Sequence, residues 1–172
     1  FIIEEGCEIA LLRRMAATMA KEAEKAGVRI VTGDTKVVER GKADGVFIST
    51  SGIGVIPPGV NIGAGRIQAG DVVIVNGVLG DHGAAILAAR GDLALSTDIE
   101  SDCASLGHLM QAALSAAPGI TAARDCTRGG LASALNEMAA EARLAIEIEE
   151  TKLPLRSEVA GVCEILGLDP LY

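Results

Sequence analysis

Four neighbouring residues in a polar turn, Gly33, Asp34, Thr35 and Lys36, bring together groups that suit phosphate chemistry. A carboxylate can bind magnesium, a glycine lets a phosphate approach the backbone, and a lysine can neutralise a phosphate oxygen or transfer a proton. The same four residues would also suit a charged surface turn without a function. Taken alone, they leave both interpretations open.

Two further glycine-rich turns, at residues 77–83 (GVLGDHG) and 124–130 (RDCTRGG), each precede a predicted helix. The N-terminus of a helix presents free N–H groups and can bind an anion. The candidate ligands are Asp81, His82, Gly83, Asp125, Thr127, Gly129 and Gly130. Thr127 is also expected to cap the following helix. The glycine spacing in the first turn matches neither the dinucleotide fingerprint nor the P-loop, so a purely structural turn containing a histidine is the alternative there.

Regularly spaced apolar residues predict the elements that position these turns. The helical period predicts helices at residues 7–26, 84–90, 104–116, 131–142 and 154–166, the first ending at Gly27. Short apolar or alternating runs predict strands at residues 1–5, 28–31, 45–56, 71–76, 120–123 and 144–149, and the turn after residue 31 leads into a second β-rich run. A polar loop is expected at 93–103. Prolines and glycines in residues 57–70 predict a boundary between two α/β units.

Composition excludes several classes of function. The 172 residues are 49% hydrophobic but only 2% aromatic, and the net charge is −8. Few aromatics and an acidic surface argue against a nucleic-acid partner. The apolar runs are too short to cross a membrane, and the opening FIIEEG is no signal peptide, so we expect a cytoplasmic protein. The four cysteines form no CxxC pair and have no histidine at ligand spacing, which argues against zinc.

Several motifs together resemble one family. FIIEEG, AGVRIVTGDTKVVERGKADGVFISTSGIGVI, GDHGAAILAAR, RDCTRGGLASALNE and GLDPLY occur in this order. In order and spacing they resemble the HypE family of hydrogenase maturation proteins. That family belongs to the PurM-like superfamily of ATP enzymes, with aminoimidazole ribonucleotide (AIR) synthetase and selenophosphate synthetase. VTGDTKVVERG is the most specific run, and the resemblance covers essentially the whole chain.

The resemblance implies an α/β, PurM-like protein of two domains. Residues 1–58 would be the C-terminal part of an AIR synthase-like N-terminal domain, residues 59–70 a linker, and residues 71–172 a truncated C-terminal domain. The implied activity is an ATP-dependent carbamoyl dehydratase that uses Mg²⁺. A carbamoyl group on the protein's own C-terminal cysteine, delivered by HypF, would become a thiocyanate. Its cyano group would pass to iron on HypC–HypD, and the N-terminal domains would pair as a homodimer.

The resemblance also implies roles for the turns. Asp34 would bind metal or nucleotide with Thr35 beside it, and Lys36 would be catalytic. Asp125, Thr127, Gly129 and Gly130 would face the nucleotide phosphates, and Asp81, His82 and Gly83 are weaker candidates for the same cleft. Cys126 would not be the acceptor, because it lies in a turn rather than on a mobile tail.

The family's upstream ATP segment and C-terminal acceptor cysteine do not occur in these residues. We therefore expect an internal fragment that is inactive by itself. Two alternatives remain: another PurM-like synthetase, of the selenophosphate synthetase type, and a non-catalytic assembly module.

Overall fold

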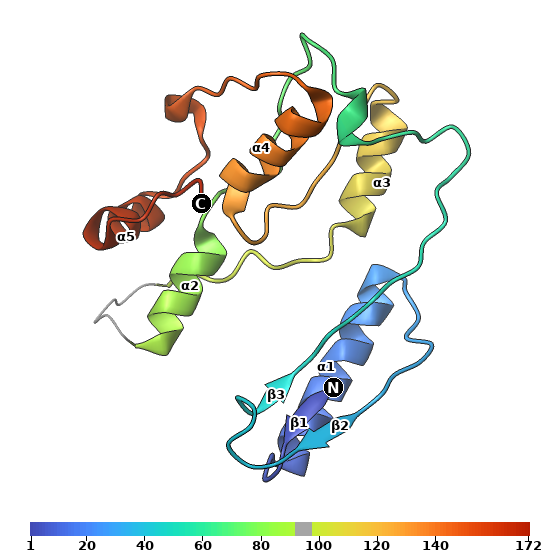
Figure 1. Cartoon of the computed structure of the whole chain (residues 1–172), viewed down its shortest axis with the longest axis vertical. Coiled ribbons are helices and arrows are strands. Elements are labelled where there is room, and N and C mark those ends of the chain that lie inside the picture. Colours follow the sequence, from blue (N-terminus) through green and yellow to red (C-terminus); the bar gives the residue numbers. More distant parts are fainter. Residues whose placement is uncertain (92–97) are drawn as a thin grey trace. The chain divides into compact units, whose positions relative to one another are not determined.

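The computed structural model describes residues 1–91 and 98–172, and it divides into two units (Figure 1). The first comprises Phe1–Pro58 and Ser105–Ala116, and the second comprises Gly59–Ala104 and Ala117–Tyr172. The expected loop at 93–103 lies partly outside the described residues, and its part from residue 98 onward has no regular secondary structure. Among the described residues, no helix combines the length and apolar character needed to cross a membrane.

The first unit contains a three-stranded sheet with the order β2-β1-β3 (Figure 1). The central strand β1 (Ile2–Glu4) confirms the strand expected at the start of the chain. It pairs in parallel with β2 (Lys36–Val38) and antiparallel with β3 (Val46–Phe47). Parallel neighbours need a crossover connection, and helix α1 (Ile9–Ala26) provides it. The expected crossover therefore exists, but it is completed by β2.

Helix α1 ends as its sequence predicts. Gly27 adopts φ 66°, in the left-handed region, and its N–H donates to the carbonyl of Glu24 at 3.0 Å. The N–H of Val28 donates to the carbonyl of Ala23, also at 3.0 Å. These two bonds satisfy carbonyl groups that the last helical turn would otherwise leave unpaired.

Two strand predictions in this unit are wrong. Residues 28–31 form no strand, and the strand predicted at 45–56 is reduced to β3. The apolar side chains of these runs are largely exposed; Val31 is 82% exposed and Val55 92%. A strand forms only when its backbone groups pair with another segment, and the described residues offer these runs no partner. Apolar character was therefore insufficient to predict a strand.

All five predicted helices are present. Helix α2 (Asp81–Arg90) begins three residues earlier than expected, so the predicted turn supplies its first residues. Helices α3 (Gly107–Ala116) and α5 (Ser157–Leu166) each begin three residues later than expected. Helix α4 (Gly130–Ala142) begins one residue early. Helix α3 groups with the first unit, and the other three belong to the second.

The second unit also has two short 3₁₀ helices, η1 (Ala64–Arg66) and η2 (Glu150–Lys152). The strands predicted at 71–76, 120–123 and 144–149 are absent from it. Val72 is 86% exposed and Ile74 88%. As in the first unit, the described residues offer the backbone of these runs no strand to pair with. In the described part of this unit, the only β pairing is an isolated bridge between Leu79 and Leu155.

Helices α2 and α5 share a small apolar core. Val159 is 1% exposed, and Leu79, Ala84 and Val162 are also buried. The N–H of Leu79 donates to the carbonyl of Pro154 at 2.8 Å. Gly80 packs so closely that a Cβ atom there would lie 2.7 Å from Cγ1 of Val159. These contacts hold the N-terminus of α2 against the start of α5.

Residues 59–70, expected as a linker, form part of the second unit. The N–H of Gly63 donates to the carbonyl of Thr121 at 2.9 Å, and that of Gly65 to Glu141 Oε1 at 3.3 Å. Asp71 directly follows the segment, and its Oδ2 accepts the N–H of Gln68 and the hydroxyl of Thr121. These two bonds, the backbone one first, lower the pKa of Asp71. η1 lies beside α4 as a result (Figure 1).

Candidate functional site

The turn at residues 33–36 lies at the beginning of the first unit's sheet. The Phe1 ammonium donates to the carbonyl of Asp34 at 2.9 Å, and the N–H of Lys36 donates to the carbonyl of Phe1 at 2.8 Å. Asp34 Oδ1 accepts the N–H of Thr35 at 2.8 Å. The turn thus starts β2 and is attached through its backbone to the residue before β1.

The side chains of Asp34, Thr35 and Lys36 in this turn are exposed. Asp34 uses one carboxylate oxygen for the bond to Thr35, which leaves the other for a cation. Within the part of the chain that the structure describes, Lys36 makes no ion pair. A carboxylate and an ammonium group two residues apart can therefore both reach a ligand such as a metal-bound phosphate.

The glycine-rich turn at residues 124–130 leads directly into α4. Gly129 occupies the N-cap position with φ 83°, and Gly130 follows with φ 59°. The expectation that Thr127 caps this helix with its side chain is wrong. Its main-chain carbonyl accepts the N–H of Gly130 at 3.0 Å, and no side chain caps the helix. With a glycine as the N-cap, the Thr127 hydroxyl takes no part in starting α4.

The close approach at Gly130 is made by the chain itself. A Cβ atom at Gly130 would lie 2.3 Å from the carbonyl oxygen of Leu171. The same oxygen accepts the N–H of Ala132 at 2.8 Å. Residues 171–172 therefore occupy part of the helix N-terminus that the sequence offered to a phosphate. Asp125 and Thr127, which lie before the helix, remain exposed.

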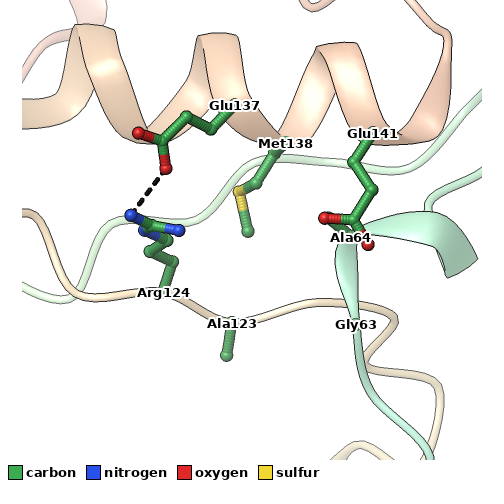
Figure 2. Close-up of a pocket in the computed structure, with 7 residues that line it drawn as sticks. All are labelled: Gly63, Ala64, Ala123, Arg124, Glu137, Met138 and Glu141. Atoms are coloured by element: carbon green, nitrogen blue, oxygen red, sulfur yellow. Dashed lines mark ion pairs between the residues drawn. The ribbon is translucent and has the colours of Figure 1, made fainter.

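A cavity of about 300 Å³ lies beside this loop, within the second unit. Figure 2 shows Arg124 directed toward Glu137 on α4, with Met138 between Glu137 and Glu141. The Arg124–Glu137 ion pair is 2.6 Å long. Two carboxylates and one already paired arginine give the cavity an acidic lining, which disfavours a phosphate group.

Cys126, in the same loop, has a raised pKa. Partial burial is the main cause, and the neighbouring carboxylate of Asp125 adds to it, while Arg124 acts in the opposite direction. A raised pKa lowers the fraction of the reactive thiolate. The environment therefore does not favour the thiolate form of Cys126.

Asp81, in the turn at residues 77–83, is a buried member of an ion pair. The residue is 3% exposed, and its Oδ2 lies 3.0 Å from Nε of Arg156. Its Oδ1 is buried and has no hydrogen-bond partner among the described residues. The carboxylate thus connects the first residue of α2 to the residue before α5.

His82 and Gly83 follow in the first turn of α2 and are exposed. His82 Nδ1 lies 2.9 Å from Ser101 Oγ and 3.6 Å from Cys103 Sγ. This contact was missed by the sequence analysis, which considered only cysteines and histidines close together along the chain. His82 and Cys103 are 21 residues apart.

The predicted site residues divide between the two units. Asp34, Thr35 and Lys36 belong to the first, and all other candidates belong to the second. Within each unit, the structure supplies exposed polar groups on ordered turns. At the N-termini of α2 and α4, other parts of the chain already fill the space beside the glycine. The side chain of Val159 packs against Gly80, and the carbonyl of Leu171 lies against Gly130.

Comparison with known proteins agrees with this architecture. Residues 68–172 match the family model described as "AIR synthase related protein, C-terminal domain". A curated relative from Rhodobacter capsulatus named "Carbamoyl dehydratase HypE" is 74% identical over all 172 residues, which span 51% of that relative. The chain thus spans about half the length of the curated relatives it matches.

Two solved structures are also similar. One is a HypE in complex with ATP, with a TM-score of 0.94 and 44% identity over 99% of this chain and 51% of that one. The other is a HypE–HypF complex, with a TM-score of 0.94 and 44% identity over 99% of this chain and 56% of that one. The predicted resemblance to HypE and the predicted α/β, PurM-like fold class are both confirmed. The chain belongs to the family of AIR synthase related proteins.

Proposed function

We propose that the intact protein carrying this chain is an ATP-dependent carbamoyl dehydratase that acts in hydrogenase maturation. The supporting observation is the 74% identity, over every residue of the chain, to a relative named "Carbamoyl dehydratase HypE". Because the alignment covers the whole chain, both exposed turns lie within it. The similar structure solved with ATP supports a nucleotide as the co-substrate.

The proposed reaction removes water from a carbamoyl group on a cysteine sulfur. The amide oxygen attacks the γ-phosphorus of ATP, so ADP leaves and the oxygen becomes part of a phosphate ester. The nitrogen starts with two protons, and it loses the first as a C=N double bond forms in this ester. It loses the second as the C–O bond breaks and inorganic phosphate leaves. The product is a thiocyanate on the same sulfur. Phosphorylation is needed because an amide oxygen is a poor leaving group.

The turn at residues 33–36 would provide the polar groups for this reaction. Asp34 is the proposed Mg²⁺ or nucleotide ligand, because its free carboxylate oxygen is the hard donor that Mg²⁺ prefers. Mg²⁺ would neutralise phosphate charge. Thr35 would hold the carboxylate through its N–H. The ammonium of Lys36 makes no ion pair within the described ranges, and it would stabilise the transferring phosphoryl group or move a proton.

The 124–130 loop would provide the second set of groups. Asp125 and Thr127 are exposed and can reach a nucleotide. Gly129 and Gly130 would act by shaping the loop, since a larger residue at either position would clash with Ser133 or Leu171. Asp81 is a weaker candidate for a nucleotide ligand, because it is already paired with Arg156.

The proposal extends to partners and domains. The similar HypE–HypF complex supports HypF as the carbamoyl donor. The proposal also includes HypC–HypD as the acceptor of the cyano group. It further includes a homodimer formed through the N-terminal domains and a cytoplasmic location. Residues 1–58 would belong to the ATP-binding, dimerising domain and 71–172 to the C-terminal domain.

Lys36→Ala tests the proposal in the full-length carbamoylated protein. We expect thiocyanate formation with ATP and Mg²⁺ to fall by about 10²–10⁴-fold, as for loss of a group that transfers a proton or stabilises charge. The measurement is the loss of one water from the modified cysteine, followed by mass spectrometry. Lys42→Ala is the matched control, because Lys42 is also exposed in the first unit but lies outside the turn.

An unchanged rate in Lys36→Ala, with Lys42→Ala also unchanged, would contradict the role of Lys36. ATP hydrolysis that depends on selenide instead would support a selenophosphate synthetase. A folded full-length protein that binds no ATP with Mg²⁺ would be an assembly module.

A further inference from the structure

Three residues outside the two turns proposed for the nucleotide form a cluster of metal-binding groups, and a serine lies beside them. His82 lies in the first turn of α2, and Ser101, Asp102 and Cys103 lie together in an irregular segment of the same unit. One ligand atom each from His82, Asp102 and Cys103 lies within 4.8 Å of the other two. All three side chains are exposed, so small adjustments of their rotamers cost little.

The distance between nitrogen and sulfur matches a shared ion. A tetrahedral zinc ion has bonds of about 2.3 Å to sulfur and about 2.05 Å to nitrogen, which separates the two ligand atoms by about 3.6 Å. The distance from His82 Nδ1 to Cys103 Sγ is 3.6 Å. A carboxylate oxygen of Asp102 lies within 4.8 Å of both atoms, so an approach of about 1 Å at most would complete a face of the tetrahedron.

Ser101 also lies against the histidine. Its Oγ accepts the N–H of Cys103 at 3.2 Å and lies 2.9 Å from His82 Nδ1. Because Oγ already accepts one hydrogen bond, its own hydrogen can be donated to Nδ1, which favours the tautomer with an unprotonated Nδ1. A bound cation would take the lone pair of Nδ1 in place of this hydrogen bond, so the serine keeps the nitrogen in the form that a metal needs but does not itself share the metal-bound state.

Charge and donor type indicate the class of ion. A neutral imidazole, a carboxylate and a thiolate together carry two negative charges, which a divalent cation balances. Thiolate and imidazole ligands favour zinc and similar borderline ions, whereas Mg²⁺ and Ca²⁺ prefer oxygen alone. The cluster therefore differs in chemistry from a Mg²⁺–nucleotide site.

We propose that His82, Asp102 and Cys103 bind one zinc-like divalent cation, with the fourth coordination position open to water or an external ligand. The ion attaches residues 101–103 to the N-terminus of α2. That terminus is itself held by the Asp81–Arg156 ion pair and by the contact of Gly80 with Val159. Three protein ligands with one open position are typical of zinc sites that bind a small ligand rather than sites that only stabilise a fold.

Cobalt(II) binding to the full-length protein tests this proposal directly. Co²⁺ occupies zinc sites and reports a bound thiolate by charge-transfer absorption in the near ultraviolet. We expect one ion per chain, this absorption, and its removal by added Zn²⁺. Cys103→Ser should abolish the absorption and weaken Zn²⁺ binding by more than about tenfold, and His82→Gln should also weaken it.

Cys126→Ser is the matched control, because Cys126 is an exposed free thiol of the same unit without a nearby histidine contact. Its spectrum and affinity should equal those of the wild type. Circular dichroism before metal addition establishes that each variant is folded. The proposal is overturned if the wild type shows no charge-transfer band, or if Cys103→Ser binds Co²⁺ with the same band and affinity.

Discussion

Gly80 provides a sharp test of the packing that positions the N-terminus of α2. The residue adopts φ 82°, and an added Cβ atom would lie 2.7 Å from Cγ1 of Val159. Val159 is 1% exposed, so its side chain has no free space into which to move. Gly80→Ala therefore combines two costs, a backbone conformation unfavourable for an L-residue and a steric overlap in the core.

The two costs can be separated with a second glycine of the same helix. Gly91 ends α2 with φ 70°, and among the residues that the structure describes an added Cβ atom there has no neighbour within 4 Å. Gly91→Ala should lower the free energy of unfolding by about 1–2 kcal/mol, the cost of the left-handed conformation. Gly80→Ala should add about 1–3 kcal/mol for the overlap, giving about 2–5 kcal/mol in total.

Urea denaturation of the full-length variants, followed by circular dichroism, measures both free energies of unfolding. The dependence of this free energy on urea concentration must be the same in the two variants for the comparison to hold. Val159→Ala removes the overlapping methyl group. In the double variant with Gly80→Ala, the loss should be smaller than the sum of the single losses by about 0.5–3 kcal/mol. Equal losses in Gly80→Ala and Gly91→Ala, with no coupling to Val159, would refute the contact.

Two further predictions concern charged groups. Arg156→Gln should lower the free energy of unfolding by about 1–3 kcal/mol, because it leaves the buried carboxylate of Asp81 without its cation. Arg124→Gln, which breaks an ion pair between exposed side chains, should cost about 0–1 kcal/mol; equal losses in urea denaturation would contradict the buried pair. The backbone N–H groups of Gly41 and Gly45, in that order, lower the pKa of Glu4 from 4.5. The stabilising effect of Glu4 should therefore be complete above pH 4.5 and disappear as the pH falls through the lowered pKa. The difference in stability between the wild type and Glu4→Gln should shrink over that acid range, and a constant difference would show that these hydrogen bonds do not depend on the charge.

The helices could be predicted because their information is local. An apolar period of 3.6 residues and a stop signal such as Gly27 both lie within one segment. The errors are confined to the ends. Helix α2 begins at Asp81 with Gly80 as its N-cap, and Gly80 packs against Val159, 79 positions further along the chain.

The strands could not be predicted in the same way. Residues 1–5 and the run at 36–38 became strands because β1 and β2 pair with each other. The runs at 28–31 and 71–76 are as apolar, yet they form no strand and are largely exposed. A strand depends on backbone partners that lie elsewhere in the chain, and the apolar composition of a segment carries no information about them.

The candidate site divides in the same manner. The residues of the 33–36 turn suited either phosphate chemistry or a charged surface turn, and the motifs indicated the family. Tertiary structure decided which groups remain free to act. It paired Asp81 with Arg156, placed Leu171 against Gly130, and brought His82 next to Cys103. Each of these contacts joins residues at least 21 positions apart. Local sequence determines which chemical groups a turn offers, whereas folding determines which of them are already used and which meet.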